Sequence, residues 1–175
     1  MKKLMLLVLF CVFLLTSCNE NGSDVIYDLN PIKLRIKVLD KNGQNMLDSK
    51  SLAYDQTFIH HTSITIQSKT YCLGDLEEED LKPSTRAYYE PFHGMMIKHY
   101  KDITYAVIGP FMADYNWRQE KVVINWGDGS KDDLQFSSIV HYKKNGEPSF
   151  HRQYLFNGVD STDIFEEKGY ITLYK

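Results

Sequence analysis

The densest group of oxygen-bearing side chains follows the second of the two tryptophans. The residues there are Trp126, Gly127, Asp128, Gly129 and Ser130, with Asp132 and Asp133 shortly after. Oxygen ligands at alternate positions of a tight loop are what Ca²⁺ requires. The EF-hand pattern fails, because Asp133 stands where that loop needs a glycine and Ile139 where it needs the closing glutamate. We therefore interpret the stretch as a solvated hairpin turn.

Histidines are the next candidate metal ligands, and the sequence holds six of them: His60, His61, His93, His99, His141 and His151. Neighbouring residues on a strand point to opposite faces, so His60 and His61 do not easily share a metal. A three-residue loop at Asn145–Glu147 would set His141 opposite His151, whereas the commoner two-residue Asn-Gly turn would pair His141 with Phe150. Two imidazoles alone make a poor zinc site. We predict no metal and no cofactor.

Local signatures of nucleophilic catalysis are missing from the sequence. It contains no Gly-x-Ser-x-Gly, Ser-x-x-Lys or His-Glu-x-x-His pattern. The acids of residues 77–80 fall on a short helix that we predict over Leu76–Leu81 and expect to be solvated. An enzyme is therefore not the preferred interpretation. The alternative is a hydrolase whose site assembles from distant loop residues, with His93, His99, Glu90 and Asp114 as the candidates.

Aromatic residues are plentiful, with 12 Tyr, 9 Phe and 2 Trp. Many belong to alternating patterns that predict a core, but some lie in segments without such a pattern. These candidate binding residues are Tyr88, Tyr89, Phe92, Tyr100, Tyr115 and Trp117. Flat rings exposed on loops suit recognition of glycans or proteins. The other interpretation is that the loops fold back and the rings seal the core.

We expect β-strands to hold the candidate residues in place, because the hydrophobic pattern beyond Pro31 repeats every two residues. Residues 32–38 alternate apolar and basic side chains, which predicts a strand with one buried face. A tight reversal at Ser68-Lys69 would set Ile66 opposite Tyr71. Residues 84–102 look irregular, and Leu76–Leu81 is the one helix that we predict. The remaining predicted strands cover residues 103–108, 122–126, 134–136, 140–144, 150–156 and 170–174.

Eight or nine short antiparallel strands separated by turn signals predict an all-β sandwich or barrel. The residues Trp126–Ser130 sharpen this prediction, since they resemble the Trp-x-Phe-Gly-Asp-Gly-Ser signature of polycystic-kidney-disease-type domains. The match departs from that signature at the aromatic before Gly127, where Trp126 stands. The resemblance implies an immunoglobulin-like β-sandwich and no activity.

The N-terminus has the pattern of a secretory signal peptide. Lys2 and Lys3 precede an apolar run from Leu4 to Leu15, which is too short to span a bilayer as a helix. Leu15-Thr16-Ser17-Cys18 resembles the lipobox of bacterial lipoproteins. The resemblance implies that Cys18 is lipidated and becomes the new N-terminus. Asn19 is not the aspartate that retains some lipoproteins at the inner membrane, so the resemblance favours the outer membrane.

The sequence thus divides into three parts: a signal peptide at residues 1–17, a lipidated polar tether at 18–30 and one domain at 31–175. The formal charge of the whole chain is −3, and we see no basic stripe that would bind nucleic acid. After loss of Cys11 and lipidation of Cys18, only Cys72 remains as a thiol. A folded monomer would then have no disulfide.

A wider resemblance covers much of the chain. Residues 38–43, 45–48, 125–132 and 156–158 look like those of small Bacteroidota lipoproteins of unassigned function. We expect a lipid-anchored envelope module that binds a glycan, a peptide or an envelope protein. The alternatives are the loop-assembled hydrolase and a structural accessory lipoprotein without a ligand of its own.

Overall fold

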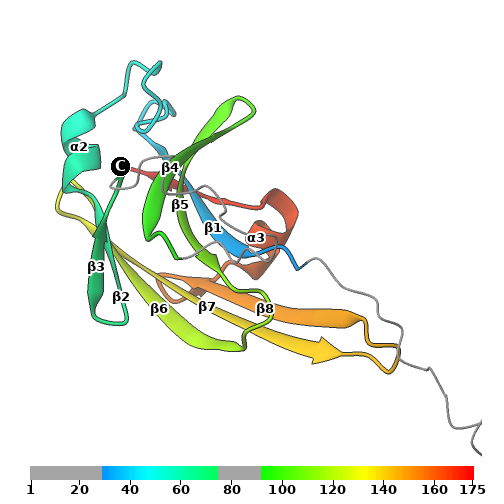
Figure 1. Cartoon of the computed structure of the whole chain (residues 1–175). Coiled ribbons are helices and arrows are strands. Elements are labelled where there is room, and N and C mark those ends of the chain that lie inside the picture. The colour runs from blue at the N-terminus through cyan, green and yellow to red at the C-terminus, as the bar shows by residue number, and fades with distance from the viewer. Residues whose placement is uncertain (1–28, 75–91) are drawn as a thin grey trace, which may run out of the picture.

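The computed structural model of the chain describes residues 29–74 and 92–175 (Figure 1). The signal peptide, Cys18 and most of the tether lie outside these residues. So do the predicted helix over Leu76–Leu81 and the candidates Tyr88, Tyr89 and Glu90. In the part that is described, no helix combines the length and hydropathy needed to cross a bilayer.

The first sheet has the strand order β10-β1-β5-β4 in the described residues. These strands are β1 (Ile32–Leu39), β4 (Met95–Tyr100), β5 (Ile103–Phe111) and β10 (Ile171–Tyr174). β1 runs antiparallel to β5 and parallel to β10. The basic residues of β1 alternate with buried aliphatic ones, so one face of the sheet is directed into the protein.

The second sheet has the order β3-β2-β6-β7-β8-β9 across the described ranges, and every pair in it is antiparallel. Its strands are β2 (Ser63–Ile66), β3 (Lys69–Cys72), β6 (Trp117–Asn125), β7 (Lys131–Tyr142), β8 (Pro148–Phe156) and β9 (Val159–Asp160). β7 and β8 form a long hairpin that extends past the first sheet (Figure 1).

The two sheets pack face to face, which confirms the predicted all-β sandwich. Their inward side chains form one apolar core with fully buried residues from both sheets, among them Ile36, Ile64, Ile108, Ile124 and Leu134. Immunoglobulin-type sandwiches carry strands D, E and B in one sheet and C′, C, F and G in the other. β4-β5-β1 and β3-β2-β6-β7 repeat that order, while β10 holds the place beside β1 that strand A fills elsewhere.

The described residues form two helices, and the sequence analysis predicted neither. They are α2 (Gln56–His61) and α3 (Thr162–Lys168). The Asp55 carboxylate accepts the Phe58 N–H and so caps α2. His60 and His61 therefore lie on a helix, and the strand argument applied to them was wrong. Helices of six and seven residues show too little periodicity to be recognised in a sequence.

Three strand predictions also need correction. β4 lies within the segment predicted to be irregular, and the two strands expected at 134–136 and 140–144 are a single strand, β7. The tight turn between β2 and β3 is at Gln67-Ser68, not Ser68-Lys69. Both turn residues have positive φ, at 47° and 64°, as a two-residue hairpin turn demands. Ile64 therefore pairs with Tyr71, whereas the predicted register paired Ile66 with Tyr71. The register is shifted by two residues, so the same side chains still share a face of the sheet.

The β7–β8 hairpin follows neither of the two registers considered. His141 pairs with Ser149, and His151 pairs with Ile139. The turn lies one residue earlier than the three-residue loop considered, since the Lys143 N–H donates to the Glu147 carbonyl at 2.9 Å and the Gly146 N–H donates to the Lys143 carbonyl at 2.9 Å. The two histidines lie diagonally and not opposite each other.

Helix α2 packs directly against the turn between β6 and β7. The Phe58 ring stacks on Trp126, with centroids 5.8 Å apart and planes 11° from parallel. Gly127 follows Trp126, and a Cβ at that position would come within 2.1 Å of the Phe58 carbonyl oxygen. No side chain fits such a gap, so the backbone approach requires glycine. The Gly127 N–H donates to Thr62 Oγ1 at 3.0 Å and completes the contact.

Candidate functional site

The structure brings two of the candidate aromatic residues together, Tyr115 and Trp117. Their ring centroids are 4.8 Å apart in an edge-to-face arrangement. Phe92 is instead half-buried against the core, between the rings of Tyr71 and Phe111. Tyr100 is exposed but lies at the β4–β5 turn, at the other end of β5 from Phe111. Tyr88 and Tyr89 fall outside the described residues.

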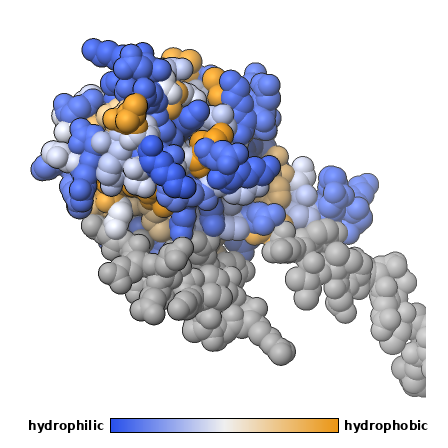
Figure 2. Space-filling model, turned by 90° about the horizontal axis from the view of Figure 1, so that it is seen from above, coloured by the Kyte–Doolittle hydropathy of each residue, from blue (hydrophilic) through white to orange (hydrophobic). Residues whose placement is uncertain are grey.

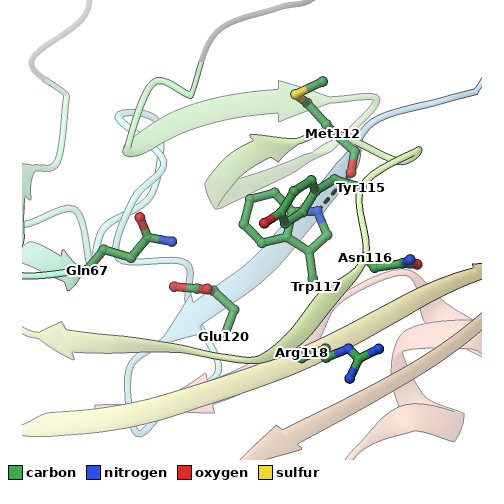
Figure 3. Close-up of a pocket in the computed structure, with 7 residues that line it drawn as sticks. All are labelled: Gln67, Met112, Tyr115, Asn116, Trp117, Arg118 and Glu120. Carbon is green, nitrogen blue, oxygen red and sulfur yellow. Dashed lines mark hydrogen bonds between the residues drawn. The ribbon is translucent and has the colours of Figure 1, made fainter.

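Tyr115 and Trp117 line an open groove of ≈ 620 Å³ at one end of the sandwich (Figure 3). The lining combines the β2–β3 turn, the β5–β6 loop and the start of β6, and it consists of Gln67, Met112, Tyr115, Asn116, Trp117, Arg118 and Glu120. Tyr115 is 57% exposed and Met112 is 43% exposed. Apolar surface of this kind is therefore left in contact with water inside a concave site.

Trp117 is fixed in place before any ligand arrives. Its indole Nε1–H donates to the Met112 carbonyl at 2.8 Å. The ring packs against Phe111 at 5.3 Å and Phe136 at 5.8 Å, both of which belong to the core. The indole is thus a rigid floor, and the Tyr115 ring stands at its edge.

A β-bulge in β6 sets the direction of the groove's side chains. Trp117 pairs with Ser138 and Glu120 with Phe136, so one extra residue lies between them on β6. Ordinary alternation would put Trp117 and Glu120 on opposite faces of the sheet, but the extra residue brings them to the same face. Gln119 absorbs the distortion with φ at 51°, and its N–H donates to Ser137 Oγ at 3.0 Å.

Two non-glycine residues with positive φ lie in or next to the groove lining: Gln67, in the β2–β3 turn, belongs to it, and Gln119, in the bulge, stands between the lining residues Arg118 and Glu120. Such backbone conformations cost about 1–3 kcal/mol each and collect at ligand sites. The bulge was not visible in the sequence, because nothing in the residue types of β6 distinguishes an extra residue from ordinary alternation.

The polar side chains around the aromatic pair are divided between two sides. In Figure 3 the Gln67 amide and the Glu120 carboxylate lie on one side, and Asn116 and Arg118 lie on the other. Asn116 has a structural task, since its Oδ1 accepts the Val140 N–H at 2.9 Å and ties the loop to β7. The groove can thus offer aromatic faces together with an amide and a carboxylate for hydrogen bonding.

The residues proposed for a loop-assembled hydrolase do not form one site in the described residues. His93 is buried just before β4, and His99 lies near the opposite end of that strand, with its Nδ1 2.8 Å from Thr104 Oγ1. Asp114 belongs to the β5–β6 loop, and Glu90 is outside the described ranges. Nowhere in residues 29–74 and 92–175 do three His, Cys, Asp or Glu side chains gather as metal ligands would.

The turn at Trp126–Ser130 uses its oxygens within the protein. Asp128 Oδ1 accepts from the Ser130 N–H at 2.9 Å and from the Ser130 hydroxyl at 2.6 Å. These bonds outweigh the effect of partial burial and lower the pKa of the Asp128 carboxyl. Asp133 pairs with Lys121 at the surface, at 2.8 Å.

Asp132 is the centre of a partly buried polar network, which we call the Asp132 cluster: Trp126, Asp132, Asn157 and Lys175. Lys175 Nζ lies 2.7 Å from Asp132 Oδ2, and the two side chains are 10% and 11% exposed. Trp126 Nε1–H donates to the same oxygen at 2.6 Å, and Asn157 Nδ2 donates to Oδ1 at 2.7 Å. The Lys175 ammonium also lies 5.2 Å from the centre of the Trp126 ring. The Lys175 ammonium thus occupies the position beside the Asp132 carboxylate where a bound metal cation would have to lie.

The electrostatics of the cluster favour the ionised acid. Burial by itself would raise the pKa of the Asp132 carboxyl, but hydrogen bonds from Asn157, Lys175 and Trp126 together hold that pKa below its usual range. The sequence analysis treated Asp132 as part of a solvated turn. Its role was missed because Asn157 and Lys175 are distant in the sequence.

Comparisons with protein-family models, with curated proteins and with solved structures find no match to this chain. The groove and the cluster are therefore interpreted from their own chemistry.

Replacement of Asp132 by asparagine should lower the free energy of unfolding by about 3 kcal/mol at neutral pH, because it leaves the Lys175 ammonium buried without its counter-charge. A carboxyl with a depressed folded-state pKa stabilises the fold above its unfolded pKa of about 3.9, and this contribution disappears as the pH falls through the folded value. The difference between wild type and Asp132→Asn should therefore shrink below about pH 4. Urea unfolding across pH measures both effects.

The neighbouring variant Asp133→Asn is the matched control. Its pair with Lys121 is about half exposed, so the loss should stay below about 1 kcal/mol. Equal losses for the two variants would contradict the assignment of a special role to Asp132.

Proposed function

We propose that this protein is a lipid-anchored binding module of a bacterial cell envelope and that the groove at Tyr115 and Trp117 holds a glycan. The observation that carries the proposal is the aromatic pair in a concave site, with the half-buried Trp117 held rigid at its floor and the exposed Tyr115 at the edge of that floor. The apolar face of a sugar ring packs on such rings, and a flat ring brings large contact area with little loss of conformational freedom.

The polar groups of the groove suit the hydroxyl groups of a sugar. The Glu120 carboxylate accepts hydrogen bonds and the Gln67 amide both donates and accepts them, and both lie on the same side of the aromatic pair (Figure 3). Among the described residues that line the groove, no second carboxylate stands beside Glu120, whereas glycoside hydrolysis commonly uses a pair. The arrangement supports recognition without chemical change of the ligand.

The proposed address is the outer membrane, reached through acyl chains on Cys18. Support comes from the lipobox-like residues Leu15–Cys18 and from the polar segment 18–30, which joins them to the sandwich. Several buried acyl chains hold a protein to a bilayer firmly, at about 0.8 kcal/mol for each CH₂ group. The kind of protein that we propose is a small lipoprotein of the Bacteroidota type.

A glycan array screened with residues 19–175 should retain at least one class of saccharide. Tyr115→Ala should weaken binding of that saccharide about tenfold or more, because it removes a central aromatic contact. Isothermal titration provides the affinities. Tyr100→Ala is the matched control, since Tyr100 is 62% exposed but lies at the other end of the sandwich, and it should bind as the wild type does. An array without hits, or an unchanged affinity of Tyr115→Ala, would refute the glycan site.

The lipid anchor is tested separately with Cys18→Ala in the full chain. Wild type should sediment with membranes and carry an acylated Cys18 at its N-terminus in mass spectra of the purified protein. The variant should lose this modification and leave the outer-membrane fraction. Wild-type protein that carries no acyl chain and is still found in the outer-membrane fraction would contradict the proposed anchoring.

A further inference from the structure

The β7–β8 hairpin continues beyond the sheet that supports it. β6 pairs with β7 only as far as Ser138, the partner of Trp117. From there to Tyr142, β7 pairs with β8 alone among the described strands, through four residues on each side. We call residues 139–151 the β7–β8 arm, and Figure 1 shows it reaching past the rest of the sandwich. A two-stranded ribbon is marginally stable in water, so an arm of this kind gains from a surface to lie on.

The arm has a small positive net charge, with two lysines against one glutamate, although the chain as a whole is acidic. Lys143 and Lys144 occupy its tip, and Arg152 follows at its base. The acid in this stretch is Glu147, which lies 2.9 Å from Lys143. The net charge of the whole chain is −3. The positive charge is therefore local, and it favours an anionic partner for this part of the molecule.

One face of the arm is apolar. Val140 pairs with Phe150 and Tyr142 with Pro148, so these four side chains share a face. This face continues that of Leu134 and Phe136, which in the sandwich is covered by the core. On the arm the same face is no longer covered by the core, and Tyr142 is 61% exposed. The Arg152 guanidinium lies over the Phe150 ring, 5.0 Å from its centroid. The arm thus combines apolar rings with a cationic rim.

The arm also lies at the end where the chain enters the fold. Ile32 begins β1 opposite Phe111, and the loop that follows Phe111 is bonded to the base of the arm through Asn116 and Val140. Figure 1 shows the first described residues at this end of the sandwich. Whatever its conformation, a chain from Cys18 to Ile32 spans at most about 50 Å. A lipid on Cys18 would therefore keep this end close to the bilayer.

We propose that the β7–β8 arm rests on an anionic lipid surface. Lys143 and Lys144 contact the lipid phosphates and other negative headgroups, and the rings of Tyr142 and Phe150 lie at the level of the headgroups. Aromatic side chains collect at that depth of a bilayer, and lysines near an anionic surface strengthen attachment. The inference goes beyond the glycan groove and does not depend on it, but it rests on the lipid anchor proposed for Cys18.

The test uses residues 19–175 without lipid, a chain that retains the whole described core, which spans Ile32 to Ile171. Sedimentation with vesicles of phosphatidylethanolamine and phosphatidylglycerol should exceed sedimentation with phosphatidylcholine vesicles, and added salt should reduce it. Lys143→Gln/Lys144→Gln should weaken partitioning onto the anionic vesicles about tenfold.

The matched control is Lys41→Gln/Lys50→Gln, which removes two exposed lysines that follow β1 at the opposite end. It should partition as the wild type does, and thermal unfolding should show that both double variants remain folded. Equal partitioning of the two variants would overturn the proposal, as would binding that is indifferent to vesicle charge. Absence of binding to every kind of vesicle would also overturn the proposal. Lys143 and Lys144 would then serve only to keep the hairpin edges from pairing with strands of another chain.

Discussion

The carboxylate of Asp132 is the interaction on which the architecture depends most. Its two oxygens receive hydrogen bonds from Trp126, Asn157 and Lys175, which come from the β6–β7 turn, the β8–β9 turn and the residue after β10. One charged group thus joins both sheets at one end of the sandwich. A buried ion pair contributes little net energy when complete, but removal of one partner is costly. Its value here lies in fixing which segments meet.

The contacts around that cluster explain why Trp126 and Gly127 stand at their positions. Trp126 supplies both an N–H for Asp132 and a face for Phe58 of α2, while Gly127 leaves room for the backbone of that helix. Figure 2 gives the view from above Figure 1, onto the ends that carry α2 and the C-terminus. The described surface there is mainly hydrophilic, with small scattered apolar patches. The opposite end carries the aromatic groove and the arm, and it is the end for which we propose a role in recognition.

Much of this fold was predictable because a half-buried strand alternates its side chains. β1, β2 and β6 show that alternation, and hairpin signals located most of the turns. β4 was missed because its sequence, Met95–Tyr100, does not alternate clearly, and the β2–β3 register was wrong because Gln67 and Ser68 adopt positive φ without being glycine. Tyr115 and Trp117 were among the six aromatic candidates chosen by residue type and by the lack of a strand pattern, but the sequence did not predict that these two rings pack together. The Asp132 cluster was not predicted, because Asn157 and Lys175 lie 25 and 43 residues away from Asp132 in the sequence.

The central claim is that one end of the sandwich is fixed by a buried charge, whereas the end for which we propose recognition is held less firmly. Hydrogen–deuterium exchange of residues 19–175, read by mass spectrometry, measures this contrast directly. The account predicts slow exchange in peptides covering the Asp132 cluster and the β6–β7 turn, and exchange faster by orders of magnitude in the β7–β8 arm, where pairing with β6 has ended. Equal protection of the two ends, or faster exchange around Asp132 than in the arm, would contradict it.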